Sequence, residues 1–153
     1  MLKTFKFLVE NIKINNLSNI KAFNLGVCGK RGMKRLFMSN ESATYSVYGN
    51  NEKYYEDIRC ITLEDIFTNH GIEKCDFLKM DCEGAEYEIL FNTPKDIIHK
   101  ISKISLEAHI TPEYKPDDIK NFLIRNKFRV YEITIENPPR VGIPGVKMIY
   151  GRK

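Results

Sequence analysis

Three acidic side chains follow a short apolar run in the middle of the chain. Residues 77–80 are succeeded at once by Asp81, Glu83 and Glu86. Gly84 lies among them, where it allows a tight turn and lets a ligand approach the backbone. Carboxylates this close repel one another, and a cation, a metal ion or a substrate hydroxyl would relieve that repulsion. Asp81 is therefore a candidate functional residue. The alternative for Glu83 and Glu86 is that they only occupy the first turn of a helix, where the helix dipole favours acids.

A second group of polar residues closes a later apolar run, Ser105-Leu106-Glu107-Ala108-His109. Glu107 and His109 alternate with Ala108, so an extended strand would present both on one side. A histidine near the mouth of a strand can act as a general base for a substrate hydroxyl. The alternative, that His109 is structural, stays open.

The elements that must position these residues alternate between strand and helix. Apolar spacing and turn signals predict helices over residues 3–15, from 61–65 to Gly71, over 85–90 and over 116–126. They predict strands over residues 20–27, 33–39, 43–48, 75–80, 101–108, 128–135 and 146–150. This order favours a single α/β domain with an open, mostly parallel sheet and an antiparallel hairpin at one edge. Ligands of such sheets bind beyond the carboxyl ends of the strands, where Asp81 and His109 are expected.

Composition narrows the class of protein. The chain has 153 residues, a net charge of +4, 42% hydrophobic and 29% charged residues. We find no apolar run near the roughly 20 residues that a membrane helix needs, and no secretory signal or address motif, so we predict a cytoplasmic protein. The basic cluster over residues 30–35 is interpreted as a solvated face and not as a nucleic-acid site. The cysteines and histidines lack zinc-ligand spacing, and no metal site is predicted from them.

Two segments together resemble a known family. Thr62-Leu63-Glu64-Asp65 precedes Asp76-Phe77-Leu78-Lys79-Met80-Asp81-Cys82-Glu83-Gly84-Ala85-Glu86. The FkbM-type methyltransferases show "T-L-D-D" and then "D-F-L-K-I-D-V-E-G-A-E". Weaker similarity covers residues 7–16, which resemble the family's "L-x-x-N-x-x-x-N" helix, and residues 104–109, which resemble its fifth strand. The chain is thus similar to this family over nearly its whole length.

The resemblance implies a Rossmann-like methyltransferase sheet of strand order 3-2-1-4-5-7-6. It implies S-adenosylmethionine as cofactor and, as acceptor, a hydroxyl on a sugar or other small metabolite. The implied catalytic residues are Lys79, Asp81 and His109, with either Asp81 or His109 as the base. The implied cofactor-binding residues are Cys28, Asp81, Glu83 and Gly84, and the implied substrate-binding residues are Glu107 and His109. The loops over residues 40–59 and 137–145 are expected to shape the acceptor site.

The chain departs from the family pattern before Cys75, where we find no Gly-rich turn. We therefore expect the first two strands, and with them the amino-terminal cofactor-binding portion, to be absent. In the implied order this leaves about 14 Å between the third and fourth strands, at roughly 4.8 Å per strand. The strand over residues 77–80 would expose an apolar edge open to self-association. We predict weak or no binding of S-adenosylmethionine by this chain alone.

Two other functions stay open. The chain could be a non-catalytic remnant of the fold that acts as a binding or assembly module. It could also be a metal-dependent enzyme in which Asp81, Glu83 and Glu86 hold Mg²⁺, since oxygen ligands suit that ion.

Overall fold

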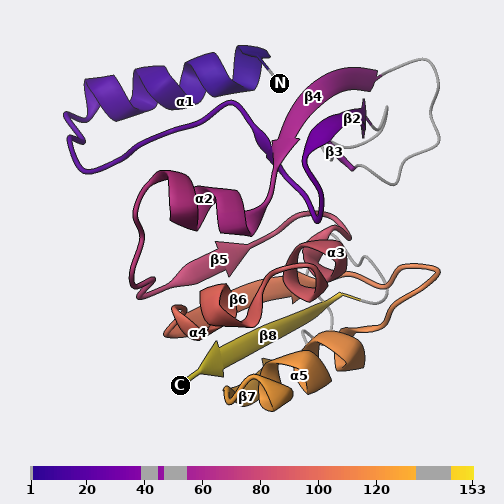
Figure 1. The fold of residues 1–153 in the computed structure, drawn as a ribbon. Helices are drawn as coiled ribbons and strands as arrows, with labels where there is room; N and C mark the ends of the chain where they lie inside the picture. Colours follow the sequence, from indigo (N-terminus) through magenta and orange to yellow (C-terminus); the bar gives the residue numbers. More distant parts are fainter. Residues whose placement is uncertain (1, 39–44, 47–54, 134–145) are drawn as a thin grey trace.

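A computed structural model describes residues 2–38, 45–46, 55–133 and 146–153 (Figure 1). The described helices are α1 (Leu2–Ile14), α2 (Leu63–Asn69), α3 (Glu86–Phe91), α4 (Lys95–His99) and α5 (Pro116–Arg125). The described strands are β1 (Gly26–Val27), β2 (Gly32–Met38), β3 (Tyr45–Ser46), β4 (Tyr55–Ile61), β5 (Leu78–Met80), β6 (Lys103–Ala108), β7 (Arg129–Ile133) and β8 (Lys147–Arg152). These strands form two four-stranded sheets.

The first sheet has the order β1-β4-β2-β3. β1 and β4 are parallel, whereas β2 is antiparallel to both of its neighbours, β4 and β3. β4 alternates exposed and buried residues in the way that a strand with one covered face requires. Its buried side chains, Ile58 and Cys60, pack with Cys28 in a small cluster of their own.

The second sheet has the order β5-β6-β8-β7. β5 and β6 are parallel, and β8 is antiparallel to both β6 and β7. This order is the 4-5-7-6 that the resemblance implies for the last four strands. The main core lies around this sheet and is built from α2, α3, α4, α5 and the strands, with Tyr87, Leu90, Leu106, Ile119 and Ile149 among its fully buried members.

The expected mixture of helices and strands is confirmed, but the expected mostly parallel sheet is not. Two of the six strand pairings in the described residues are parallel and four are antiparallel. The antiparallel hairpin at one edge, β7 with β8, is present. All four antiparallel pairings are made by two strands, β2 and β8, each of which runs against both of its neighbours.

Several predicted elements change their bounds. The strand expected over residues 20–27 is reduced to Gly26–Val27, the two residues that pair with β4. Apolar alternation predicted a longer strand, yet Ile20 and Phe23 are about half exposed and have no pairing partner among the described strands. The strand expected over residues 75–80 is likewise shortened to β5, with one isolated bridge from Cys75 to Ile101.

Two elements were missed. β4 lies in the segment treated as a loop over residues 40–59, although the alternation of Ile58 and Cys60 with polar residues could have indicated it. α4, which the sequence does not predict, begins directly after Pro94, at a position where proline suits the start of a helix. The strands expected over residues 33–39 and 43–48 are present as far as they are described, as β2 and β3, which pair with each other. The loop over residues 137–145 and most of residues 40–54 lie outside the described residues.

The first sheet contacts the second through α2 and α3. α2 begins at Thr62, whose side chain caps the helix, and Asp65 completes the capping box. Its Leu63 and Phe67 are buried in the main core. Lys34 of β2 lies 2.6 Å from Glu88 of α3. A Cβ at Gly29 would come within 2.5 Å of the Glu88 carbonyl oxygen, so this close approach requires glycine.

β5 is the outer strand of the second sheet, with β6 as its only described partner. Phe77, just before it, is 57% exposed. This is the arrangement on which the prediction of self-association through residues 77–80 depends, and that prediction is not tested. None of the described helices has the length and apolar character needed to cross a bilayer.

Candidate functional site

The turn after β5 is held by the first residue of α3. Glu83 and Gly84 both have positive φ, at 51° and 104°, and Gly84 tolerates this conformation because it lacks a Cβ. The Glu86 carboxylate accepts hydrogen bonds from the backbone N–H groups of Cys82 at 2.8 Å and Gly84 at 3.0 Å. The predicted turn over residues 81–84 is therefore confirmed, and a buried carboxylate fixes its shape.

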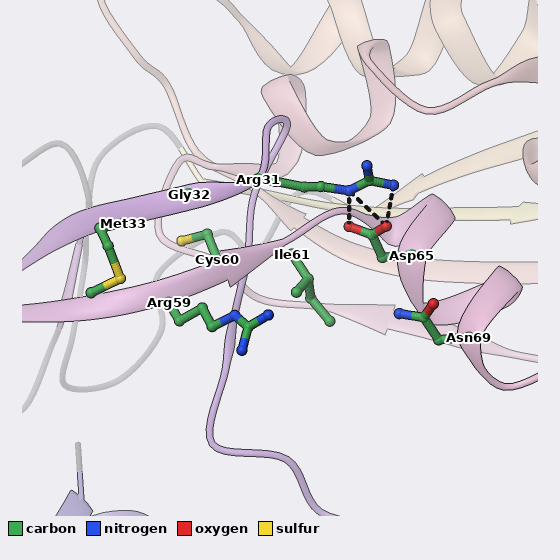
Figure 2. Close-up of a pocket in the computed structure, with 8 residues that line it drawn as sticks. All are labelled: Arg31, Gly32, Met33, Arg59, Cys60, Ile61, Asp65 and Asn69. Atoms are coloured by element: carbon green, nitrogen blue, oxygen red, sulfur yellow. Dashed lines mark hydrogen bonds and ion pairs between the residues drawn. The ribbon is translucent and has the colours of Figure 1, made fainter.

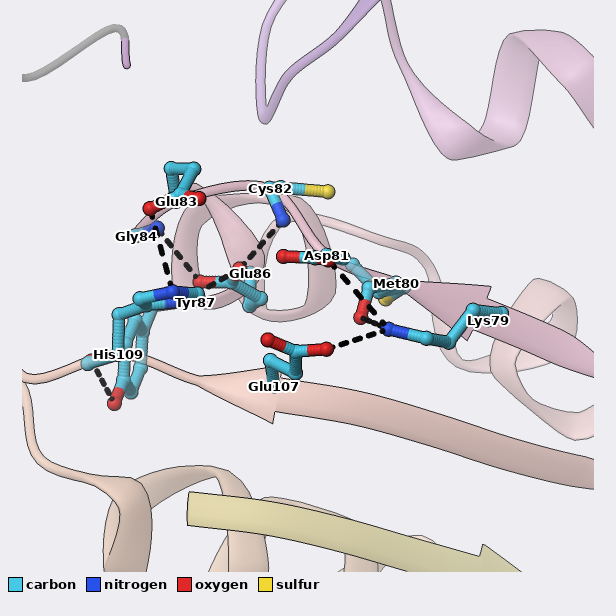
Figure 3. Close-up of polar contacts among 10 residues, drawn as sticks. All are labelled: Lys79, Met80, Asp81, Cys82, Glu83, Gly84, Glu86, Tyr87, Glu107 and His109. Atoms are coloured by element: carbon cyan, nitrogen blue, oxygen red, sulfur yellow. Dashed lines mark hydrogen bonds and ion pairs between the residues drawn. The ribbon is translucent and has the colours of Figure 1, made fainter. Parts of the chain in front are cut away.

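Asp81, Glu107 and His109 meet beyond the carboxyl ends of β5 and β6 (Figure 3). The register pairs Met80 with Leu106, which brings the residues that follow each of them side by side. One oxygen or nitrogen atom from each of the three side chains lies within 4.8 Å of those of the other two. The expectation that adjacent parallel strands deliver these residues to one rim is confirmed.

Lys79 supplies a positive charge to this rim. Its Nζ lies 3.3 Å from Oε1 of Glu107 and 3.9 Å from Oδ2 of Asp81. Lys79 and Asp81 are two residues apart on an extended segment, so both side chains point to the same side. Both are about half exposed, so the ion pairs contribute little to stability, and the lysine chiefly offsets the repulsion between the two acids.

His109 is held between two carboxylates. Nδ1 lies 3.2 Å from Oε1 of Glu86, and Nε2 lies 3.4 Å from Oε2 of Glu83. The Tyr87 hydroxyl donates to the backbone carbonyl of His109 at 2.7 Å. The hydrogen bond to Glu86 raises the pKa of His109, against the opposing effect of burial, and the charges of Glu86, Glu83 and Asp81 act in the same direction as that bond.

Cys28 lies across a groove from this rim. The groove encloses about 230 Å³ and is lined on one side by residues 25–28, Leu36 and Ile58 and on the other by Asp81, Cys82, Glu83 and Ala85. The Sγ atoms of Cys28 and Cys60 are 2.8 Å apart, and both cysteines are free thiols. Burial, followed by the contact with Cys60, raises the pKa of the Cys28 thiol to about 12. Cys28 is therefore a neutral part of the wall.

The structure thus brings together every predicted site residue. Lys79, Asp81, Glu107 and His109 form the rim, Glu83 and Gly84 form the turn beside it, and Cys28 faces the turn. Their roles in catalysis and binding stay predictions. Tyr87 is not among the predicted site residues, and Glu86 is predicted only as a ligand of the alternative Mg²⁺ site; both are fully buried and bonded to His109. An acidic residue at a helix start gave no sequence signal that its carboxylate turns inward.

The arrangement does not favour the Mg²⁺ set of Asp81, Glu83 and Glu86. Both oxygens of Glu86 already accept backbone hydrogen bonds, and one also contacts His109. Among the described residues, the donor group whose geometry suits a metal ion is Asp81, Glu107 and His109. Lys79 already places a cation beside two of those three side chains.

A separate cavity of about 480 Å³ lies between β2, β4 and α2 (Figure 2). Asp65 contributes to its wall, but its carboxylate is fully engaged by Arg31 and by the backbone N–H of Thr62. This engagement holds the pKa of Asp65 well below its usual range. Three members of the basic cluster are paired with acids: Arg31 with Asp65, Lys34 with Glu88 and Arg35 with Asp57. The acids of the first two pairs are buried or largely buried, so these pairs connect elements, and the interpretation of the cluster as a solvated face stays a prediction.

The chain matches a family model described as "Methyltransferase FkbM domain" over residues 9–130. The chain belongs to the FkbM methyltransferase family. The match includes the capping box of α2, the turn after β5 and the rim formed by Asp81, Glu107 and His109. No curated protein and no solved structure gives a significant match to this FkbM domain.

Proposed function

We propose that this FkbM domain transfers a methyl group from S-adenosylmethionine to a hydroxyl of a sugar or another small metabolite. The observation that carries the proposal is the rim of Asp81, Glu107 and His109 beside a groove that leads to Cys28. The rim places acid–base side chains next to a cavity at the carboxyl ends of two adjacent parallel strands. This is the position at which α/β sheets bind ligands.

The residues of the groove fit the chemistry of the cofactor. Asp81 and Glu83 line it and offer carboxylates to a positively charged sulfonium or to ribose hydroxyls. Leu25, Val27 and Ile58 offer an apolar surface that suits a purine ring. When bound, S-adenosylmethionine would supply an electrophilic methyl group on a sulfonium.

The chain's own residues would align the acceptor and remove its proton. Asp81 is half exposed at the rim, so its carboxylate can reach a hydroxyl that enters from solvent. Glu107 lies beside it and can accept a second hydrogen bond from a polyhydroxylated acceptor, while Lys79 fixes the orientation of both acids. Holding the hydroxyl in line with the methyl group accounts for much of the rate enhancement available to such a site.

Calorimetry with S-adenosylmethionine up to millimolar concentration tests the cofactor. We expect saturable binding weaker than low-micromolar, lost in Asp81→Asn and retained in Asp57→Asn, a matched control on β4 whose carboxylate pairs with Arg35 outside the rim. Low-micromolar binding would contradict only the expected weakness. The sequence also allows no binding at all, and absence of any saturable binding would refute methyl transfer by this chain alone and favour the binding-module alternative.

Transfer of a radiolabelled methyl group to a panel of sugars and small hydroxyl compounds tests the acceptor. We expect labelled product with at least one hydroxyl compound in the panel, and loss of that product in Asp81→Asn. Labelling of amines or thiols alone would contradict the assignment of a hydroxyl acceptor.

A further inference from the structure

Glu86 is a fully buried carboxylate with an unusually complete set of partners. Its side chain has no exposed surface. Oε1 accepts from the Cys82 N–H and lies next to Nδ1 of His109, and Oε2 accepts from the Gly84 N–H. An isolated buried carboxylate would be strongly destabilising, so these contacts are what allow Glu86 to be buried. One side chain therefore connects the turn after β5 to the residue that follows β6.

The surroundings of His109 determine which groups its ring can bond. Nδ1 faces Glu86 and Nε2 faces Glu83. An ionised carboxylate only accepts hydrogen bonds, so Nδ1 must carry a hydrogen to bond Glu86, and Nε2 must carry one for its 3.4 Å contact with Glu83 to be attractive. Only the imidazolium form has two such hydrogens.

We propose that Glu86 is a positioning residue that holds His109 as a two-fold hydrogen-bond donor, so that His109 orders the turn and does not serve as the base. This inference rests on the proposed function for its catalytic meaning, because it leaves Asp81 as the base for the acceptor hydroxyl. The arrangement of Glu86, His109 and the turn is itself independent of the reaction.

The charged and titratable groups around His109 support this state. Glu86 and Tyr87 face it from α3, Glu83 and Asp81 from the turn, and Glu107 from β6. Lys79 is engaged by Glu107 and Asp81 and neutralises part of that negative charge. The raised pKa of His109 has the direction that this environment requires. A raised pKa means that the pairing stabilises the fold fully below the ordinary histidine pKa of about 6.5 and is lost as the pH rises through the raised value.

Nuclear magnetic resonance of the full chain, with ¹⁵N-labelled histidine, measures directly whether the two ring nitrogens of His109 are protonated. The chain has three histidines, so the signal of His109 is assigned by its loss in His109→Gln. We expect both ring nitrogens of His109 to show imidazolium shifts at neutral pH. Glu86→Gln should lower the pKa of His109 by about one unit or more, a tenfold or larger loss of proton affinity. Glu88→Gln changes an acid on the same helix that pairs with Lys34, and it should leave the pKa of His109 unchanged.

Two further measurements keep the inference separable from the proposed function. Glu86→Asp keeps a carboxylate at this position, so the pKa of His109 should be higher in Glu86→Asp than in Glu86→Gln. A loss of packing alone would not produce this difference. In an active preparation, the high-pH limb of the kcat profile should move to lower pH in Glu86→Gln, whereas a merely structural defect would lower kcat equally at every pH.

A neutral His109 in the wild-type chain at neutral pH would overturn the inference, as would an unchanged pKa in a folded Glu86→Gln. If Glu86→Gln does not fold, Glu83→Gln provides the same test from the other ring nitrogen, with a smaller expected decrease. The resonance experiment needs no cofactor, so a failure to bind S-adenosylmethionine would refute the proposed function and leave this result standing.

Discussion

Asp65 joins two structures that would otherwise be independent, the start of α2 and the turn before β2. Its carboxylate accepts from the Thr62 N–H at 2.9 Å and from Nε of Arg31 at 2.8 Å. The Thr62 hydroxyl accepts in return from the Asp65 N–H at 3.1 Å. Asp65→Ala removes the ion pair and half of the capping box together, and it leaves a backbone N–H without its partner.

The size of the effect follows from these contacts. Losing a capping interaction costs about 1 kcal/mol. The ion pair adds at most about 1 kcal/mol, because the Arg31 side chain is 72% exposed and solvent screens the pair. The better helix propensity of alanine offsets about 0.5 kcal/mol. We expect Asp65→Ala to lower the free energy of unfolding by about 0.5–1.5 kcal/mol, and Arg31→Met, which spares the cap, to lower it by less.

Urea denaturation of both variants at neutral pH measures these values, and Glu64→Gln, an exposed acid on the first turn of α2, is the matched control. The pairing lowers the pKa of Asp65, so the unfolded state binds its proton more readily. The stabilisation is therefore present above the ordinary aspartate pKa of about 3.9 and is lost as the pH falls through the lowered value. The difference in free energy of unfolding between wild type and Asp65→Ala should therefore decrease as the pH is lowered. Equal stability of the two proteins at neutral pH would refute this account of α2.

The remaining predictions concern the rim, the contact between the sheets and the core. Asp81→Asn should lower kcat/KM by about 10²–10⁴-fold, the usual contribution of a general base, with an unchanged melting temperature; a loss below tenfold in a methyl-transfer assay would argue against Asp81 as base. Gly29→Ala should lower the free energy of unfolding, measured by urea denaturation, by about 1–3 kcal/mol, because the added Cβ would lie 2.5 Å from the Glu88 carbonyl oxygen. A variant as stable as wild type would show that the first sheet does not approach α3 this closely. Leu106→Ala, at a fully buried position of β6, should lower the free energy of unfolding by about 2–5 kcal/mol in the same measurement. A decrease of less than about 1 kcal/mol would place β6 outside the core. Addition of Mg²⁺ or of a chelator should leave the melting temperature unchanged, since Lys79 already offsets part of the charge of Asp81 and Glu107; a clear upward shift with Mg²⁺ would instead favour a metal at Asp81, Glu107 and His109.

The amino-acid sequence by itself determined the features that depend on neighbouring residues. Thr62 at the start of an apolar pattern predicts the N-cap of α2. Asp65, three residues later, suits a capping box only partly, since Glu or Gln is usual there, and the structure has the complete box. An apolar run that ends in Asp81 and is followed by Gly84 predicts a strand and then a tight turn, and both are present. The motif around Asp81 also indicated the family that the match over residues 9–130 then showed.

Only the tertiary structure decided the features that depend on partners distant in sequence. Apolar alternation gives residues 20–27 and β4 similar patterns, but a strand needs a neighbour for its backbone hydrogen bonds. Among the described strands, β4 pairs with two and residues 20–25 pair with none. The inward orientation of Glu86 depends on where β6 places His109, 23 residues further along the chain. The partner of Arg31 depends on the docking of the first sheet against α2. Hydrogen bonds of this kind are set by the packing of whole elements, so local spacing carries no record of them.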